Sequence, residues 1–230
     1  MRRALRTWWA LVGRDLRIEW RSKEILYTGG LFAVVLVTLF LFSGFQDRAV
    51  QAQAAPGVLW VSIALTGTLV FGRTFERDRE ADALSGLLMI PGIAGPLFAA
   101  KLTTNVLLLL VIEALLVPAV FLTFSLQHVG SWPGLMAVLA LGTLGFATLG
   151  TVLAAALAAL RMREVLLPLV LYPLVIPLLL SGVRATHALL HPHADGDWTD
   201  WVGVMIAFNA LFLVLARWLF EEAVDHGETG

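Results

Sequence analysis

One carboxyl group lies where a lipid bilayer is expected, and it is the first candidate for chemistry. Glu113 stands inside a long apolar run, and Pro118 follows it about one helical turn later. An ionisable side chain at that depth is costly and commonly faces the interior of a helix bundle. We predict a structural or gating role for Glu113 rather than direct substrate binding; a carboxyl that is protonated or bonded to a neighbouring helix is the simpler alternative.

A charged segment, FERDREADALSGLLMIP (75–91), is a second candidate, for protein binding rather than catalysis. Charged residues recur one helical turn apart, an apolar stripe follows, and Pro91 ends it. The candidate contact residues are Phe75, Glu76, Arg77, Arg79, Glu80, Leu84, Leu87 and Leu88. A helix with charged and apolar faces can dock in the groove of a partner. A solvated loop with an interfacial helix is the alternative.

Histidine and aspartate gather in a third place, at His187, His191, His193, Asp195, Asp197 and Asp200. Their spacing matches no helical metal motif, and Pro192 interrupts the run, so we predict a solvated loop and no metal site. The chain contains no cysteine, which excludes disulfides and thiolate ligands. It also lacks a phosphate-binding loop, a nucleophile elbow and an H-E-x-x-H pair. We therefore expect a protein that is not an enzyme and binds no cofactor directly.

The composition requires a membrane, because 59% of the 230 residues are hydrophobic and only 14% are charged. About 20 apolar residues cross a bilayer as a helix. Six segments approach that length: Ile25–Phe45, Pro56–Phe75, Leu102–Leu126, Pro133–Leu160, Val165–Val183 and Trp198–Phe220. The second is among the shortest, and it could prove to be a shallow or broken helix. We predict an all-α protein with a six-helix membrane domain (25–220), a cytoplasmic loop (73–100) and a C-terminal tail (221–230).

Lysine and arginine fix the predicted orientation, because short cytoplasmic loops carry most of them. With the N-terminus in the cytoplasm, all of the sixteen fall on that side except Arg48 and Arg184. Both termini are then cytoplasmic, and the first span is too long for a cleaved signal peptide. Lys101 lies near the inner surface, where it can extend toward water and should not reach Glu113.

The N-terminal segment (1–24) predicts an amphipathic helix in the membrane interface. Leu5, Trp9, Val12, Leu16 and Trp20 recur on one face, and Arg3, Arg6, Arg14, Arg17 and Arg21 on another. Such a helix lies flat, with arginine toward anionic headgroups. A basic tail that only sets the topology is the alternative.

Two spans carry unusual residues. Pro168, Pro173 and Pro177 each remove a backbone donor from the fifth span and are typical of a moving or cavity-lining helix. Gly150, Ala154 and Ala158 form a ridge of small residues on the fourth span, which favours close helix packing.

Taken together, these residues resemble the heme exporter protein B (CcmB) family. The match includes RDLRIEWRSKEIL (14–26), APGVLWV (55–61), the charged segment 75–91, Lys101, LLLLVIEALLVP (107–118) and the proline-rich span, in that order. The resemblance implies an ABC-2-like permease subunit of the cytochrome c maturation system in the bacterial inner membrane. It implies that residues 75–91 meet a separate ATPase subunit, and that Arg77, Arg79, Glu80, Leu84 and Leu87 make the contact.

The family works with a heme-handling membrane subunit and a heme chaperone, so the resemblance places ATP and heme on partner subunits. Export or delivery of heme, or release of the heme-loaded chaperone, would be the output. A homodimer, or pairing with another membrane subunit, would complete the membrane domain. Two alternatives stay open: an ABC permease for a lipid, drug or polysaccharide, and a membrane scaffold that transports nothing.

Overall fold

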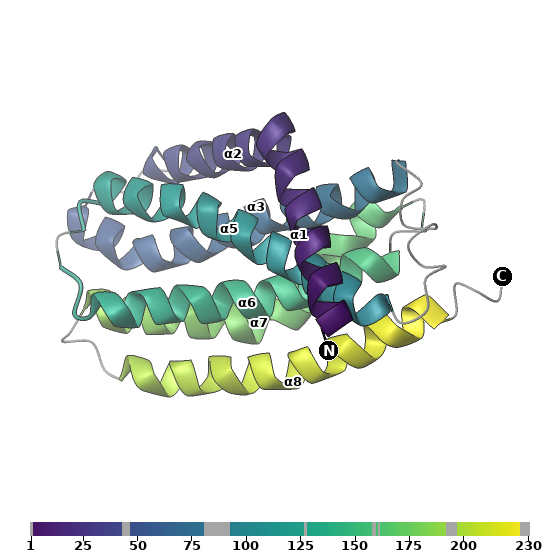
Figure 1. Cartoon of the computed structure of the whole chain (residues 1–230). Helices are drawn as coiled ribbons and strands as arrows, with labels where there is room; N and C mark the ends of the chain where they lie inside the picture. Colours follow the sequence, from purple (N-terminus) through teal and green to yellow (C-terminus); the bar gives the residue numbers. More distant parts are fainter. Residues whose placement is uncertain are drawn as a thin grey trace.

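The computed structural model describes residues 2–42, 47–80, 93–126, 128–157, 160, 162–191 and 197–225. Residues 2–4, 48–49, 75–80, 94 and 217–225 are described by their backbone alone. Within these ranges nearly every residue is helical. The helices, labelled as in Figure 1, are α1 (Arg2–Ser22), α2 (Glu24–Leu41), α3 (Arg48–Glu80), α5 (Ala94–Thr123), α6 (Trp132–Leu157), α7 (Arg163–Leu190) and α8 (Trp198–Asp225).

Six of these helices are long and apolar enough to cross a membrane, which confirms the predicted all-α fold with six spans. They run side by side, and α1 lies across them toward one end of the bundle (Figure 1). We call this the α1 end. It holds the start of α2, the end of α3, the start of α5 and the C-terminal turns of α8 (Figure 1).

Three span boundaries differ clearly from the prediction: the starts of the second and third spans and the end of the fifth. The second span covers Val50–Thr74 and is not the shortest, because Pro56 lies inside α3 rather than at its start. The shortest span is Glu24–Leu41. A proline lacks only one donor, and neighbouring helices can compensate for it in a membrane.

Two loops and the C-terminal tail are also shorter than predicted. The outer loop expected at 184–200 begins later, because α7 continues through Leu190 and includes Arg184 and His187. The loop expected at 73–100 is helical at both ends, since α3 reaches Glu80 and α5 starts at Ala94. Half of the tail expected at 221–230 is helical as well, because α8 ends at Asp225.

The core of the bundle is built around α6, of which 72% of the span is buried. Glycines on α6 and α7 let a large side chain of α3 enter between them: a Cβ on Gly142 or Gly182 would overlap the ring of Trp60. The Trp60 indole nitrogen donates a hydrogen bond of 3.0 Å to Thr186 Oγ1 on α7. Gly150 makes room in the same way for Phe71, which stacks edge-to-face on Phe146. Gly142 and Gly150 of the fourth span therefore serve helix packing within this chain, and Ala158 of the predicted ridge lies outside the described residues.

The prolines of α7 do not interrupt the helix, and they lie away from the core. Pro173 and Pro177 are exposed and Pro168 is half-buried, on the face that also carries exposed leucines. Pro118 on α5 is exposed as well. These prolines face the surroundings of the bundle rather than its interior.

Candidate functional site

The α1 end carries a junction between α1 and α5 that combines apolar packing with charge. Leu11 and Val12 of α1 are buried in one cluster with Ile93, Leu97 and Phe98 from the start of α5. The indole nitrogen of Trp8 donates to Thr103 Oγ1 on α5 at 3.3 Å. The face of α1 that packs on α5 therefore differs from the predicted apolar stripe, of which Val12 alone is buried.

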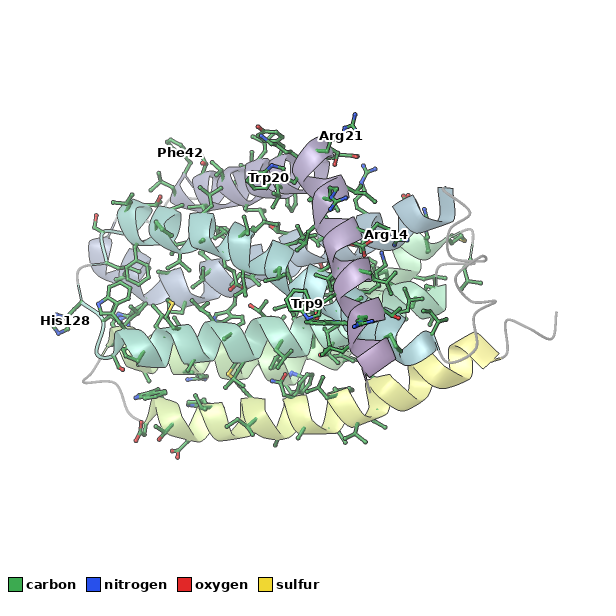
Figure 2. All side chains as sticks on the ribbon, viewed as in Figure 1. Trp9, Arg14, Trp20, Arg21, Phe42 and His128 are labelled. Atoms are coloured by element: carbon green, nitrogen blue, oxygen red, sulfur yellow. The ribbon has the colours of Figure 1, made fainter. Side chains whose placement is uncertain are left out.

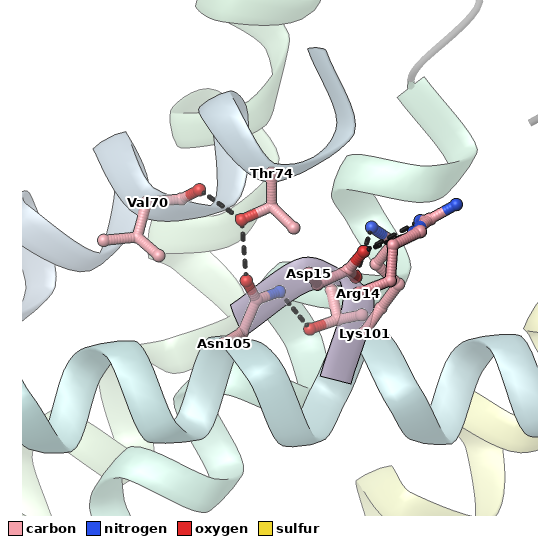
Figure 3. Close-up of polar contacts among 7 residues, drawn as sticks. Arg14, Asp15, Val70, Thr74, Lys101 and Asn105 are labelled. Carbon is pink, nitrogen blue, oxygen red and sulfur yellow. Dashed lines mark hydrogen bonds and ion pairs between the residues drawn. The ribbon is translucent and has the colours of Figure 1, made fainter. Parts of the chain in front are cut away.

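A buried ion pair lies at the centre of this junction. Lys101 Nζ on α5 lies 2.7 Å from Asp15 Oδ2 on α1, and the two residues are only 2% and 8% exposed. Arg14 adds two contacts to the other carboxylate oxygen, with Nη2 at 2.8 Å and Nε at 2.9 Å from Asp15 Oδ1 (Figure 3). Lys101 therefore does not extend toward water as predicted. An opposite charge on a separate helix keeps it inside the protein.

A second buried carboxylate joins α1 to α2. Glu19 is 3% exposed, and its Oε1 accepts a hydrogen bond of 3.0 Å from the backbone nitrogen of Leu26 in the first turn of α2. The first turn of a helix has free N–H groups and a partial positive charge, so a carboxylate is stabilising there. Between the two helices only Lys23 is non-helical, with φ 53° in the left-handed region. A single residue thus makes the corner between α1 and α2.

The remaining faces of α1 fit the predicted interfacial helix. Trp9 and Trp20 are 62% and 77% exposed, although they are large apolar side chains. In Figure 2, Trp20 lies on the side of α1 toward the spans and Arg14 on the opposite side. Arg17 and Arg21 are exposed. A helix at a membrane interface has this arrangement, with tryptophan toward the acyl chains and arginine toward the headgroups.

One turn further into the bundle, a polar network ties α5 to two spans. Asn105 Nδ2 donates to Thr151 Oγ1 on α6 at 2.9 Å. Asn105 Oδ1 lies 2.8 Å from Thr74 Oγ1 on α3, whose proton is shared with the carbonyl of Val70 (Figure 3). All three side chains are buried. This network fixes the end of the α3 span against α5 directly before the charged segment begins.

The charged segment starts as a continuation of α3. Phe75, Glu76, Arg77, Arg79 and Glu80 occupy the last turns of that helix, beyond the span that ends at Thr74. Leu84, Leu87 and Leu88 lie outside the described residues. The chain returns at Ile93, which packs on α1. The segment is therefore anchored on one side by the Asn105 network and on the other by the α1–α5 junction.

Glu113 lies deep in the bundle, 4% exposed, and accepts a hydrogen bond from the Thr143 hydroxyl on α6. Glu113 therefore faces the bundle interior as expected, and its bond to a neighbouring helix is the one that the simpler alternative describes; its structural or gating role stays a prediction. Asn209 makes a similar link from α8, with Nδ2 3.0 Å from the carbonyl oxygen of Leu141. Both polar side chains connect α6 to a neighbour.

The histidine cluster does not form a metal site in the described part of the chain, where no three histidine or acidic side chains gather. His187 and His191 stack at 4.5 Å between ring centroids at the end of α7. Asp197 and Asp200 lie at the start of α8 and are exposed. His193 and Asp195 lie outside the described residues.

With this geometry established, comparison with known proteins gives the family. Residues 6–227 match the family described as CcmB protein, which is nearly the whole chain. The chain belongs to the CcmB protein family. The resemblance inferred from the sequence is thereby confirmed.

Individual relatives agree with this assignment. Heme exporter protein B of Haemophilus influenzae is 33% identical over 77% of this chain and 80% of its own length. Heme exporter protein B of Bradyrhizobium diazoefficiens is 29% identical over 95% of this chain and 97% of its own length. Heme exporter protein B of Paracoccus denitrificans is 32% identical over 76% of this chain and 80% of its own length. With bacterial relatives and six spans, the chain is a multi-pass bacterial membrane protein.

The sequence did not single out the residues that build the α1–α5 junction. Asp15 and Glu19 stand among arginines, and the two faces predicted for this helix include neither of them. One signal was present: together with Trp8, Leu11 and Val12, the two acidic residues form a continuous helical face, because the spacings are three, four and seven. A carboxylate on an otherwise apolar face predicts a buried partner of opposite charge.

Proposed function

We propose that this protein is the permease subunit of an ABC transporter complex that serves cytochrome c maturation. In this proposal a separate cytoplasmic subunit hydrolyses ATP, and the complex exports or delivers heme or releases a heme-loaded chaperone. Membership of the CcmB family supports it, together with relatives named heme exporter protein B. ATP and heme are held by partner subunits, a heme-handling membrane protein and a heme chaperone among them.

The proposed orientation places the α1 end in the cytoplasm and both termini with it. The exposed arginines of α1 and Arg73 lie at this end, whereas Arg48 and Arg184 lie toward the other. An excess of basic residues in short cytoplasmic segments supports this direction. The membrane is then the bacterial inner membrane.

Cysteine labelling tests the orientation directly, because the natural chain has no cysteine. Ser22 at the α1 end and His128 at the opposite end are both exposed. In intact cells, a membrane-impermeant maleimide should label His128→Cys and spare Ser22→Cys until the membrane is opened. The reverse pattern would refute the proposed orientation.

The observation that carries the coupling role is the position of the charged segment. It leaves the bundle from α3, which the Asn105 network holds against α5, and it returns at Ile93 beside α1. A force on the segment therefore acts on α3 and α5 at once, and through Lys101 and Asp15 on α1. Binding energy at the segment can shift the bundle between two states only if the partner contacts these states differently.

Charge reversal in the segment tests the docking of the ATPase. Arg77→Glu combined with Glu80→Arg should abolish co-purification of the ATPase subunit in mild detergent and stop cytochrome c assembly in cells. A double reversal at the opposite end, Arg184→Glu with Asp200→Arg, is the matched control and should leave both unchanged. If the ATPase still co-purifies with the Arg77/Glu80 variant and cytochrome c is assembled, residues 75–91 are not the contact.

The proteins that co-purify with the unaltered chain decide between transport functions. An ATPase together with heme-handling subunits is the expected result. An ATPase without any heme-handling subunit would indicate a permease for another substrate. Recovery of heme-handling subunits with no ATPase would indicate a membrane scaffold.

A further inference from the structure

A cavity opens between α3, α6 and α7 at the α1 end. Its volume is about 390 Å³, in the range of about 300–1,000 Å³ that is usual for pockets that hold small ligands. Leu69, Gly72 and Arg73 line it from α3, and Arg163 and Glu164 from α7. None of these residues belongs to the junction between α1 and α5.

Charged and apolar groups lie at different depths in this cavity. Arg73 follows Leu69 by one turn on α3, and Arg163 precedes Leu167 by one turn on α7. Because α3 runs toward the α1 end and α7 runs away from it, both arginines lie in the outer turn. Both leucines lie about 6 Å deeper. The two spans end at this level, at Thr74 and Arg163, so the arginines are at the depth of lipid headgroups.

With arginines in the outer turn and leucines one turn deeper, the cavity suits an amphiphilic ligand that has an anionic headgroup and a hydrocarbon chain. Guanidinium groups bind phosphate through paired hydrogen bonds. The leucines below offer a surface for a hydrocarbon chain. Glu164, the neighbour of Arg163 in the same lining, is exposed and can accept hydrogen bonds from an ammonium group.

Arg73 also has an acidic neighbour outside the cavity. Its Nη1 lies 3.6 Å from Glu24 Oε1 on α2, and both side chains are about half exposed. An exposed ion pair of this kind contributes little to stability. A phosphate can therefore share the guanidinium of Arg73 without a large loss.

We propose that this cavity binds one phospholipid of the leaflet at the α1 end, and that it prefers phosphatidylethanolamine. Arg73 and Arg163 hold the phosphate, Leu69 and Leu167 contact an acyl chain, and Glu164 faces the ethanolamine ammonium. The site is separate from the charged segment and from the deep carboxyl group of Glu113. It does not depend on the proposed transport function.

One glycine offers a way to fill the cavity. A Cβ on Gly72 would meet nothing within 4 Å, so a leucine there extends into the cavity without disturbing the backbone. Gly57 on the same helix is equally open and does not line the cavity, which makes Gly57→Leu the matched control.

Native mass spectrometry of the purified protein, mixed with equal amounts of phosphatidylethanolamine and phosphatidylglycerol, tests the proposal. The natural chain should retain one phospholipid, mainly phosphatidylethanolamine. Gly72→Leu should lower that retention by about tenfold, or about 1.4 kcal/mol, because the leucine side chain occupies the space of the lipid. Gly57→Leu should retain lipid like the natural chain. Retention by Gly72→Leu at the natural level would overturn the proposal.

Charge variants provide an independent test should Gly72→Leu fail to fold. Arg73→Gln combined with Arg163→Gln should lower retention of both lipids, and Arg184→Gln, on α7 at the opposite end, should lower neither. Glu164→Gln should keep a bound phospholipid but lose the preference for phosphatidylethanolamine. If the natural chain retains phosphatidylethanolamine and phosphatidylglycerol equally, the proposed preference is wrong. If hemin displaces the lipid when added at the same concentration, the site is not a phospholipid site.

Discussion

Two junctions of this bundle are held together by different physics. At the α1–α5 junction, Asp15 and Lys101 attract each other as a buried ion pair, with Arg14 as a further cation. At the α3–α6–α7 junction, Trp60 fills a slot between Gly142 and Gly182 and makes one neutral hydrogen bond to Thr186. The first junction adds a buried charge pair to its apolar packing, whereas the second depends on shape.

This difference indicates where the protein can change conformation. A close-packed slot tolerates no displacement without loss of contact, because dispersion falls steeply with distance. The buried ion pair between α1 and α5 can exchange its partners for water or lipid headgroups once α1 moves and exposes it. We therefore expect motion of α1 against α5 and a rigid group of α3, α6 and α7.

Breaking the ion pair should have the largest effect. Asp15→Ala leaves Lys101 buried without its carboxylate, which costs about 3–5 kcal/mol at a buried site. Thermal unfolding in detergent should show a lower Tm, and hydrogen exchange should increase in α1 before it does in α6. The swapped pair Asp15→Lys with Lys101→Asp should recover a large part of the loss. Equal exchange throughout the chain would show that the two junctions are not separate.

Overfilling the slot should have the next largest effect. Gly142→Val places methyl groups where the Trp60 ring lies, and overpacking of this kind costs about 1–3 kcal/mol. Here α3, α6 and α7 should lose protection from exchange together. Gly203→Val on α8 is the control, because a Cβ there meets nothing within 4 Å. An unchanged Tm for Gly142→Val would mean that Trp60 can leave the slot at little cost.

Neutralising Glu113 should have the smallest effect on stability. The amide oxygen in Glu113→Gln can still accept the hydrogen bond of Thr143, so the free energy of unfolding should change by less than about 1 kcal/mol. Cytochrome c assembly in cells then separates a gating role from a structural one. If cytochrome c assembly is normal in Glu113→Gln, the carboxyl group has only a structural role, through its contact to α6. If the variant folds but does not support assembly, the result favours gating.

The parts of the fold that depend on local composition were predictable. Apolar runs and basic clusters gave six spans and an N-terminal amphipathic helix, since each is a property of 20 or so consecutive residues. The interior position of Glu113 followed from the cost of a carboxyl group in lipid. Membership of the family could be recognised because the charged segment and Lys101 kept their order along the chain.

Features that depend on pairs of distant residues were not predictable. Asp15 and Lys101 are 86 positions apart, and neither reveals its partner by spacing. Lysine near a helix end usually extends toward water, so its burial follows only from the approach of α1. The start of α3 was misplaced because Pro56 was taken as a boundary, although its neighbours in the bundle tolerate it inside the helix.

The length of α3 gives it the geometry of a lever. Its 33 residues span about 50 Å, more than the hydrocarbon thickness of a bilayer. Trp60, in its slot, lies about 18 Å from Arg48 and about 30 Å from Glu80 along this helix. If α3, α6 and α7 tilt as one rigid group about the level of Trp60, a 5 Å displacement at Glu80 moves Arg48 by about 3 Å in the opposite direction. A displacement of the charged segment would thus produce a smaller displacement, in the opposite direction, on the far side of the membrane.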